Sequence, residues 1–196
     1  MSLYSPTKNF IYIHIPKTGG TSIESLGVFG ESYNKHYDIE YFKETYGDLS
    51  KIFKFTFVRD PYTRFASSVL RHAVPQRKPS SPIMELPPEE LKLINKGRFT
   101  DYTLKNSNSF DDVVALKRQH GFLEIDGKIE MDFIGRFENL QEDFNRLCEG
   151  LGLGKRILPH EMKGTYNDYD WFYTKETREI VAEYYSKDFE MFNYEK

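Results

Sequence analysis

The sequence predicts an α/β fold in which helices cover both faces of a central parallel sheet. Three strand-like segments are each followed by a loop and a helix-compatible segment, and the first strand, residues 10–15, is apolar or aromatic apart from His14. A strand that is apolar on both sides is typical of a parallel sheet buried on both faces. In such folds, ligands bind at the carboxyl ends of the strands.

The composition is that of a globular protein with one core. The 196 residues are 39% hydrophobic, enough for one sizeable core, so we expect a single domain spanning residues 1–196. The net charge of −3 argues against general affinity for nucleic acid, so any anion site must be local. We find no apolar run long enough to span a membrane and no room for a signal peptide before the first strand, so we expect a soluble, cytoplasmic protein.

The first strand is followed by two predicted helices. Residues 21–28 are compatible with a helix that begins directly after a glycine-containing loop. Asp38 is a suitable N-cap for a second short helix, which Gly47 can end. Three apolar residues of that helix fall on one face: Ile39, Phe42 and Tyr46.

A second strand-loop-helix unit follows. Phenylalanines alternate over residues 53–58, which places one face of this strand in the core. Asp60 can cap the next helix, and Pro61 suits its first position. Residues 75–108 are richer in Pro, Ser, Lys and Asn, so we expect a variable insertion or mobile region there. A helix is predicted near residues 110–119.

A small hairpin and a third strand come next. Residues 123–130 alternate around Asp126-Gly127, a pair typical of a primed two-residue turn. We expect this hairpin to be peripheral to the core. Residues 131–137 are predicted to form another strand of the main sheet.

The last two predicted helices have recognisable first turns. Asn139 and Glu142 match a capping box ahead of a helix with apolar residues at helical spacing. Thr174 is a suitable N-cap for the final helix. The side chains of that helix predicted to face inward are Ile180, Val181 and Tyr184.

The loop between the first strand and the first helix has the composition of an anion site. Unpaired backbone N–H groups and the helix dipole attract phosphate-like oxygens at such a junction. Glycine lets the backbone approach a ligand, lysine supplies a positive charge, and hydroxyl groups donate hydrogen bonds. The loop residues are Lys17, Thr18, Gly19, Gly20, Thr21 and Ser22.

This loop does not match that of nucleoside triphosphatases. Their loop requires Gly-Lys followed by Ser or Thr, with four residues between its two glycines. Here Lys17 precedes the glycines, and Asp60 is better explained as a helix cap than as a magnesium ligand. We therefore expect a site that needs no metal.

Two stretches, PKTGGTS and FTFVRDPYTRFASS, together resemble the cofactor signature of sulfotransferases. They are most similar to the Golgi-type carbohydrate sulfotransferases of the heparan sulfate 2-O and 6-O kind. The resemblance extends through DFIGRFENLQEDF and residues 158–194, so it covers most of the chain outside residues 75–108. It implies a P-loop-like three-layer sandwich, 3′-phosphoadenylyl sulfate (PAPS) as donor, adenosine 3′,5′-bisphosphate (PAP) as product and a saccharide hydroxyl as acceptor.

The resemblance also implies which residues bind the donor. The loop of residues 17–22 holds the 5′-phosphosulfate, and Arg59 with Ser67 grips the 3′-phosphate, a role that guanidinium and hydroxyl groups suit chemically. Alternatively, Arg59 pairs with Asp60. A late loop that folds over the nucleotide corresponds to Lys163, Gly164 and Thr165, next to Met162, where relatives often carry asparagine.

Transfer to an alcohol needs a group that removes the alcohol proton, and histidine is the natural base near neutral pH. The chain has five: His14, His36, His72, His120 and His160. In related carbohydrate sulfotransferases the base follows the first helix, and NKHYDIEYFKE resembles that segment, so His36 is the predicted base. By the same resemblance, Lys17 also bonds to the leaving oxygen. His14 is expected to be a core residue of the first strand.

Two other functions stay open from the sequence. One is a non-catalytic nucleotide-binding or regulatory module that keeps the donor site but lacks a working acceptor cleft. The other is a small kinase, which would bind its nucleotide with magnesium. Residues 166–173 contain an aromatic run that could stack on a sugar or on adenine, although packing against the last helix explains it as well.

Overall fold

The computed structural model describes residues 2–29, 35–73, 114–159 and 169–196. Its contacts divide the chain into two compact units, Met1–Asp60 with Arg118–Lys163, and Pro61–Lys117 with Gly164–Lys196, and each is described by itself. The expected single domain stays a prediction. The predicted insertion at residues 75–108 lies outside the described residues.

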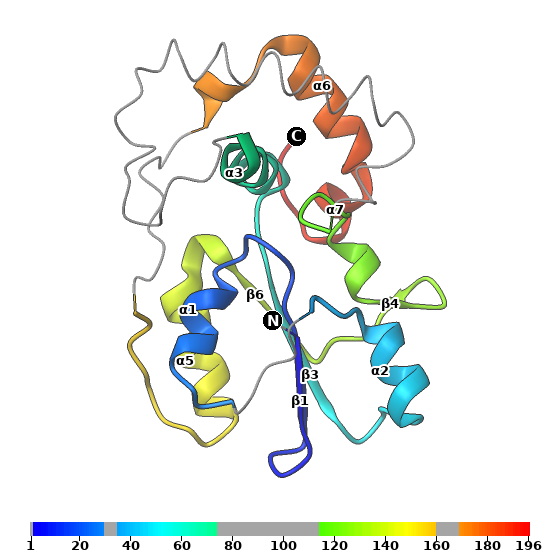
Figure 1. The fold of residues 1–196 in the computed structure, drawn as a ribbon, viewed down its shortest axis with the longest axis vertical. Helices are drawn as coiled ribbons and strands as arrows, with labels where there is room; N and C mark the ends of the chain where they lie inside the picture. Colours follow the sequence, from blue (N-terminus) through cyan, green and yellow to red (C-terminus); the bar gives the residue numbers. More distant parts are fainter. Residues whose placement is uncertain (1, 30–34, 74–113, 160–168) are drawn as a thin grey trace. The chain divides into compact units, whose positions relative to one another are not determined.

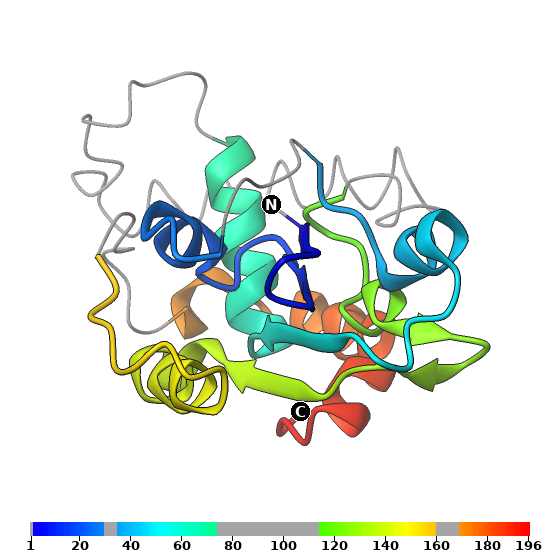
Figure 2. The ribbon, with the colours of Figure 1, turned by 90° about the horizontal axis from the view of Figure 1, so that it is seen from below.

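A four-stranded sheet in the order β1-β2-β3-β6 forms the centre of the first unit. Strand β1 runs antiparallel to β2, whereas β2, β3 and β6 are parallel to one another (Figure 1). Figure 2 shows β3 and β6 side by side. The bounds are β1 Leu3–Ser5, β2 Phe10–Ile13, β3 Phe53–Val58 and β6 Phe133–Arg136. The predicted α/β class with a mostly parallel sheet is confirmed, and β1 is an additional edge strand.

Helices lie on both faces of this sheet (Figure 1). Side chains alternate along a strand, so Leu3 and Tyr4 of β1 point to opposite faces. Leu3 joins the core cluster shared with two helices, whereas the ring of Tyr4 lies 4.6 Å from that of Tyr46 on a third helix. The three helices are α1 (Gly20–Ser25), α5 (Leu140–Gly150) and α2 (Ile39–Tyr46).

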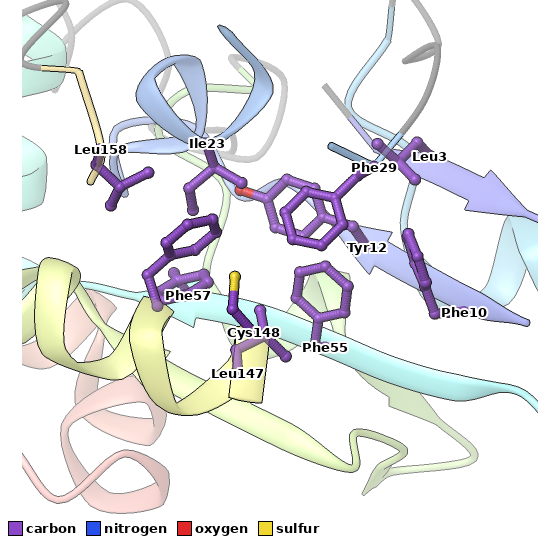
Figure 3. Packing of buried hydrophobic residues seen from close by; sticks show 11 residues of the cluster. Leu3, Phe10, Tyr12, Ile23, Phe29, Phe55, Phe57, Leu147, Cys148 and Leu158 are labelled. Atoms are coloured by element: carbon purple, nitrogen blue, oxygen red, sulfur yellow. The ribbon is translucent and has the colours of Figure 1, made fainter. Parts of the chain in front are cut away.

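Aromatic side chains fill the space between the sheet, α1 and α5. Figure 3 shows Ile23 of α1 and Cys148 of α5 pointing toward the strand side chains between them. The rings of Tyr12 and Phe55 stack across neighbouring strands with centroids 4.9 Å apart. This packing fixes the end of β2, and therefore the loop that follows it, against two helices.

The predicted helix caps of the first unit have different outcomes. The carboxylate of Asp38 accepts a hydrogen bond from the Tyr41 N–H at 3.0 Å, and Gly47 ends α2, as predicted. The capping box at Asn139 is wrong, because Asn139 makes no side-chain cap bond and its backbone is not extended. A short 3-10 helix, η4 (Phe137–Asn139), precedes α5 and takes that place.

The predicted hairpin is confirmed as β4 (Glu124–Ile125) and β5 (Lys128–Ile129). Asp126 and Gly127 both have positive φ, as a primed turn requires. The helix predicted near residues 110–119 is wrong for its described part, because residues 114–119 form a turn and bends ahead of η3 (His120–Phe122).

The second unit is a cluster of helices around buried aromatic rings. Its elements are α3 (Pro61–Ala73), η5 (Asp170–Phe172), α6 (Lys175–Tyr184) and α7 (Ser186–Met191). The half-buried Tyr173 donates its hydroxyl to Tyr62 O at 2.6 Å. Thr174 caps α6 as predicted, and Val181 is buried as predicted. Ile180 is 40% exposed, so its predicted inward position is wrong.

Candidate active site

The loop between β2 and α1 turns through two residues with left-handed backbone. Lys17 has φ 72° and Gly19 has φ 84°, a conformation that costs lysine more than glycine. A Cβ on Gly19 would lie 2.6 Å from Leu140 Cδ2 and 3.3 Å from Phe137 Cδ2. The loop is therefore held in a conformation that the sequence permits only with glycine at position 19.

The first residue of α1 lies against a histidine ring. A Cβ on Gly20 would come within 2.1 Å of His14 Nε2, so only glycine fits there without displacing the ring. The other ring nitrogen, His14 Nδ1, lies 2.5 Å from Glu24 Oε1 on α1. The His14 ring thus connects the end of β2 with the beginning and the middle of α1.

The hydroxyl groups of the loop have different roles. Thr18 is fully buried, and its hydroxyl donates to Ile15 O at 2.8 Å. Its hydroxyl hydrogen is therefore used within the loop, so a contact to an anion would come from its backbone N–H. Thr21 is exposed and Ser22 is half-buried in the first turn of α1, where a hydroxyl can reach a ligand.

Arg59 follows the last residue of β3 and is directed toward the same loop. It is 7% exposed, and its Nη1 donates to Lys17 O at 3.2 Å. Its guanidinium lies over the ring of Phe137, 4.0 Å from the centroid. The backbone N–H of the next residue, Asp60, donates to Glu138 Oε1 at 2.8 Å. Two positive side chains, Lys17 and Arg59, therefore belong to adjoining segments of one site.

The His36 side chain bonds to the backbone just after β2. Its Nδ1 lies 2.8 Å from His14 O, and since a carbonyl can only accept, Nδ1 carries the proton. Nε2 is then the basic nitrogen. The buried Ser2 hydroxyl accepts from His14 N–H at 3.1 Å and donates to Tyr37 O at 2.7 Å. These bonds fix both the position and the tautomer of His36.

His14 is a buried histidine, as expected, but it also contacts the predicted base. The rings of His14 and His36 meet edge to face with centroids 4.6 Å apart. Burial, followed by the positive N-terminus and by His36, holds the pKa of His14 well below the usual 6.5. His14 is therefore neutral near pH 7 and donates Nδ1–H to Glu24.

Comparison with protein families matches residues 1–195 to the sulfotransferase family. The chain belongs to this family. No curated protein and no solved structure gave a significant match to the chain. Because the family match extends over nearly the whole sequence, sulfuryl transfer to an acceptor is the activity that the family supports, and a nucleotide donor is implied.

The remaining predicted site residues of this sulfotransferase lie in the second unit or outside the described residues. Ser67 lies half-buried on α3 in the second unit, so its predicted pairing with Arg59 stays a prediction. Lys163, Gly164 and Thr165 lie outside the described residues, as does Met162. His120 is buried in η3, and His72 lies on α3.

Three residues that contact the predicted site residues or their neighbours were not apparent from the sequence. Ser2 bonds to the segment that carries His36, Phe137 lies under the Arg59 guanidinium, and Gln119 bonds to the Arg59 backbone. Each acts across a separation of 35 residues or more. For Phe137 the only sequence signal was its place at the end of a predicted strand, where ligands bind in α/β folds.

Within residues 2–29, 35–73, 114–159 and 169–196, no group of three or more His, Cys, Asp or Glu side chains is placed to hold a metal ion. None of the helices in the described part of the chain combines the length and the apolar character that crossing a bilayer requires.

Proposed function

We propose that this sulfotransferase moves the sulfuryl group of PAPS to a hydroxyl group of a saccharide, with His36 as the general base. The observation that carries the proposal is the bond from His36 Nδ1 to His14 O at 2.8 Å. It leaves Nε2 as the proton acceptor on a ring anchored to the same strand end that leads into the Lys17 loop. A base must be held in one tautomer to act efficiently.

The donor site combines the loop of residues 17–22 with Arg59. The loop holds the 5′-phosphosulfate through backbone N–H groups, the Lys17 ammonium and the hydroxyls of Thr21 and Ser22. Arg59 holds the 3′-phosphate, together with Ser67 from α3. By the resemblance to the family, Lys163, Gly164 and Thr165 also belong to the proposed donor site. The Arg59 bond to Lys17 O supports the assignment, since it joins the two halves of the donor site.

In the reaction, the acceptor oxygen forms a new bond to sulfur while the bond from sulfur to the bridging phosphate oxygen breaks. The acceptor proton passes to His36 Nε2. The electron pair of the broken bond stays on the bridging oxygen, which leaves as part of PAP and is stabilised by the Lys17 ammonium. In these reaction steps the proton and the charge are accounted for by residues of this chain, and no metal is needed.

The proposed acceptor is a hydroxyl group of a saccharide. This choice rests on the resemblance of PKTGGTS and FTFVRDPYTRFASS to the heparan sulfate 2-O and 6-O type of carbohydrate sulfotransferase. A soluble enzyme acting in the cytoplasm belongs to the same proposal.

Turnover of PAPS over a panel of saccharides, measured as PAP release and as sulfate on the sugar, tests the proposal. We expect His36→Ala to lower the rate by about 10²–10⁴-fold, the usual contribution of a general base, and to leave PAP affinity unchanged. A variant that keeps the full rate, or that loses PAP affinity in parallel, would exclude His36 as the base. A wild-type protein that binds PAP but transfers nothing to any acceptor would support the non-catalytic alternative.

A further inference from the structure

Gln119 forms two hydrogen bonds to a single backbone residue, Arg59. Its Oε1 accepts from Arg59 N–H at 2.9 Å, and its Nε2 donates to Arg59 O at 2.8 Å. Gln119 is fully buried. Bonding both the N–H and the C=O of one residue is the pattern that a neighbouring strand uses in a sheet.

Arg59 lies just after the paired residues of β3. The last pair between β2 and β3 is Ile13 with Thr56, and the last pair between β3 and β6 is Val58 with Arg136. Arg59 therefore lies beyond the ladder on both sides. A buried backbone group has to be hydrogen-bonded, and the Gln119 amide satisfies both the N–H and the C=O of Arg59.

The guanidinium of Arg59 is held separately from its backbone. Its Nη1 bonds to Lys17 O at 3.2 Å, and the Phe137 ring lies beneath it at 4.0 Å. A side chain can keep such contacts only if its Cα and backbone torsions stay fixed. Gln119 is the group that fixes them, since it bonds to the backbone on both sides of the Arg59 Cα.

We propose that Gln119 is a positioning residue for Arg59, holding it ready to bind the 3′-phosphate of the donor. This inference rests on the proposed function, in which Arg59 binds that phosphate. Gln119 acts through Arg59 and makes no contact to the nucleotide. Preorganisation of a charged side chain removes an ordering cost that the ligand would otherwise have to offset.

The chain offers a matched control in Gln141. Its Oε1 accepts from Leu158 N–H at 2.8 Å, and its Nε2 donates to Arg156 O at 2.7 Å. Gln141 therefore makes the same kind of side-chain bonds to backbone, but on α5 and to a different segment. Gln141 is exposed and its Nε2 also bonds to Asn145 Oδ1. Replacing either glutamine with methionine keeps the length of the side chain and removes its hydrogen bonds to backbone.

The experiment compares binding of PAP with binding of adenosine 5′-phosphosulfate, which lacks the 3′-phosphate. We expect Gln119→Met to weaken PAP binding about tenfold and to leave adenosine 5′-phosphosulfate within about twofold. Gln141→Met should change neither. In an Arg59→Ala background, Gln119→Met should have no further effect on PAP, because the residue through which it acts is gone.

Equal weakening of both nucleotides by Gln119→Met would assign Gln119 a merely structural role, and unchanged PAP binding would overturn the inference while leaving the proposed function in place. If Gln119→Met does not fold, Gln119→Asn, which keeps the amide but shortens the side chain, is measured instead. A folded wild-type protein that binds neither nucleotide would overturn the proposed function and this inference with it.

Discussion

Ser2 is a buried hydroxyl that links two segments beside His36. Its bonds to His14 N–H and to Tyr37 O hold the residue that follows the proposed base. We expect Ser2→Ala to lower kcat about tenfold, because a loosened base is less well aligned, and to leave PAP affinity unchanged. Ser50→Ala is the control, since that hydroxyl bonds to Asp48 on the surface. Steady-state kinetics measures kcat and a PAP titration measures PAP affinity for both variants. A normal kcat of Ser2→Ala would show that Ser2 does not position His36.

Gly20 is the point at which α1 touches the His14 ring. A Cβ at this residue would lie 2.1 Å from His14 Nε2, and the ring cannot move away freely because Glu24 holds its other nitrogen. We expect Gly20→Ala to lower the free energy of unfolding by about 1–3 kcal/mol, the usual cost of overpacking. Denaturation with urea measures it.

The control for this prediction is a glycine with open space around it. Gly150, the last residue of α5, has no atom within 4 Å of an added Cβ. Gly150→Ala should be neutral or stabilise by up to about 1 kcal/mol, because alanine loses less entropy in a helix. Equal stability of the two variants would contradict the close contact between Gly20 and His14.

At the scale of elements, α6 begins with a reciprocal cap. The Thr174 hydroxyl accepts from Thr177 N–H at 3.2 Å, and Thr177 Oγ1 accepts from Thr174 N–H at 2.8 Å. We expect Thr174→Ala to destabilise the protein by about 1 kcal/mol. Thr45→Ala, which removes an exposed hydroxyl bonded to Tyr41 O within α2, should change stability by less than about 0.5 kcal/mol. Urea midpoints for the two variants that agree within error would refute the role of the cap.

Some elements could be predicted because their signals are local. The cap at Asp38, the turn at Asp126-Gly127 and strand β3 each follow from a few adjacent residues. The box at Asn139 failed because η4 occupies the approach to α5, so the backbone at Asn139 is not extended. Strand β1 could not be predicted, because three residues are too few to show a period and its pairing depends on β2.

In the candidate site, too, only the features with a local sequence signal could be predicted. Glycines and Lys17 could be found because they form one contiguous loop between a strand and a helix. Gln119 could not, because a single polar residue at the end of a predicted helix carries no signal of its own, and its role exists only once folding brings it to Arg59, 60 residues away. The sequence also could not show that the Thr18 hydroxyl is used inside the loop, since that bond depends on the turn itself.

At the scale of the whole molecule, stability should depend on the protonation of His14. Its pKa in the folded protein lies well below the 6.5 of an unfolded chain, so below about pH 6.5 the unfolded state binds more protons than the folded state. The contribution of His14 is therefore fully present above pH 6.5 and is lost progressively as the pH falls toward its folded pKa.

Urea denaturation at pH 7.5 and 5.5, compared between the wild type and His14→Gln, measures this contribution. The wild type should lose more stability on acidification than the variant, because glutamine does not titrate. Parallel losses would mean that His14 keeps an ordinary pKa in the folded protein. A wild type that gains stability relative to the variant would mean that Glu24 raises this pKa instead.

The central claim is that the Lys17 loop and Arg59 bind the two phosphate-bearing ends of a sulfuryl donor. Calorimetric titration of the protein with PAP, and with ATP plus magnesium, tests it most directly on the wild type, Arg59→Ala and Arg178→Ala. Arg178 is the matched control, since its guanidinium lies 4.1 Å from the ring centroid of Tyr62, much as Arg59 lies over Phe137. We expect PAP to bind, ATP with magnesium not to compete, and only Arg59→Ala to weaken PAP binding. Preference for ATP with magnesium, or PAP binding that is indifferent to Arg59, would contradict it.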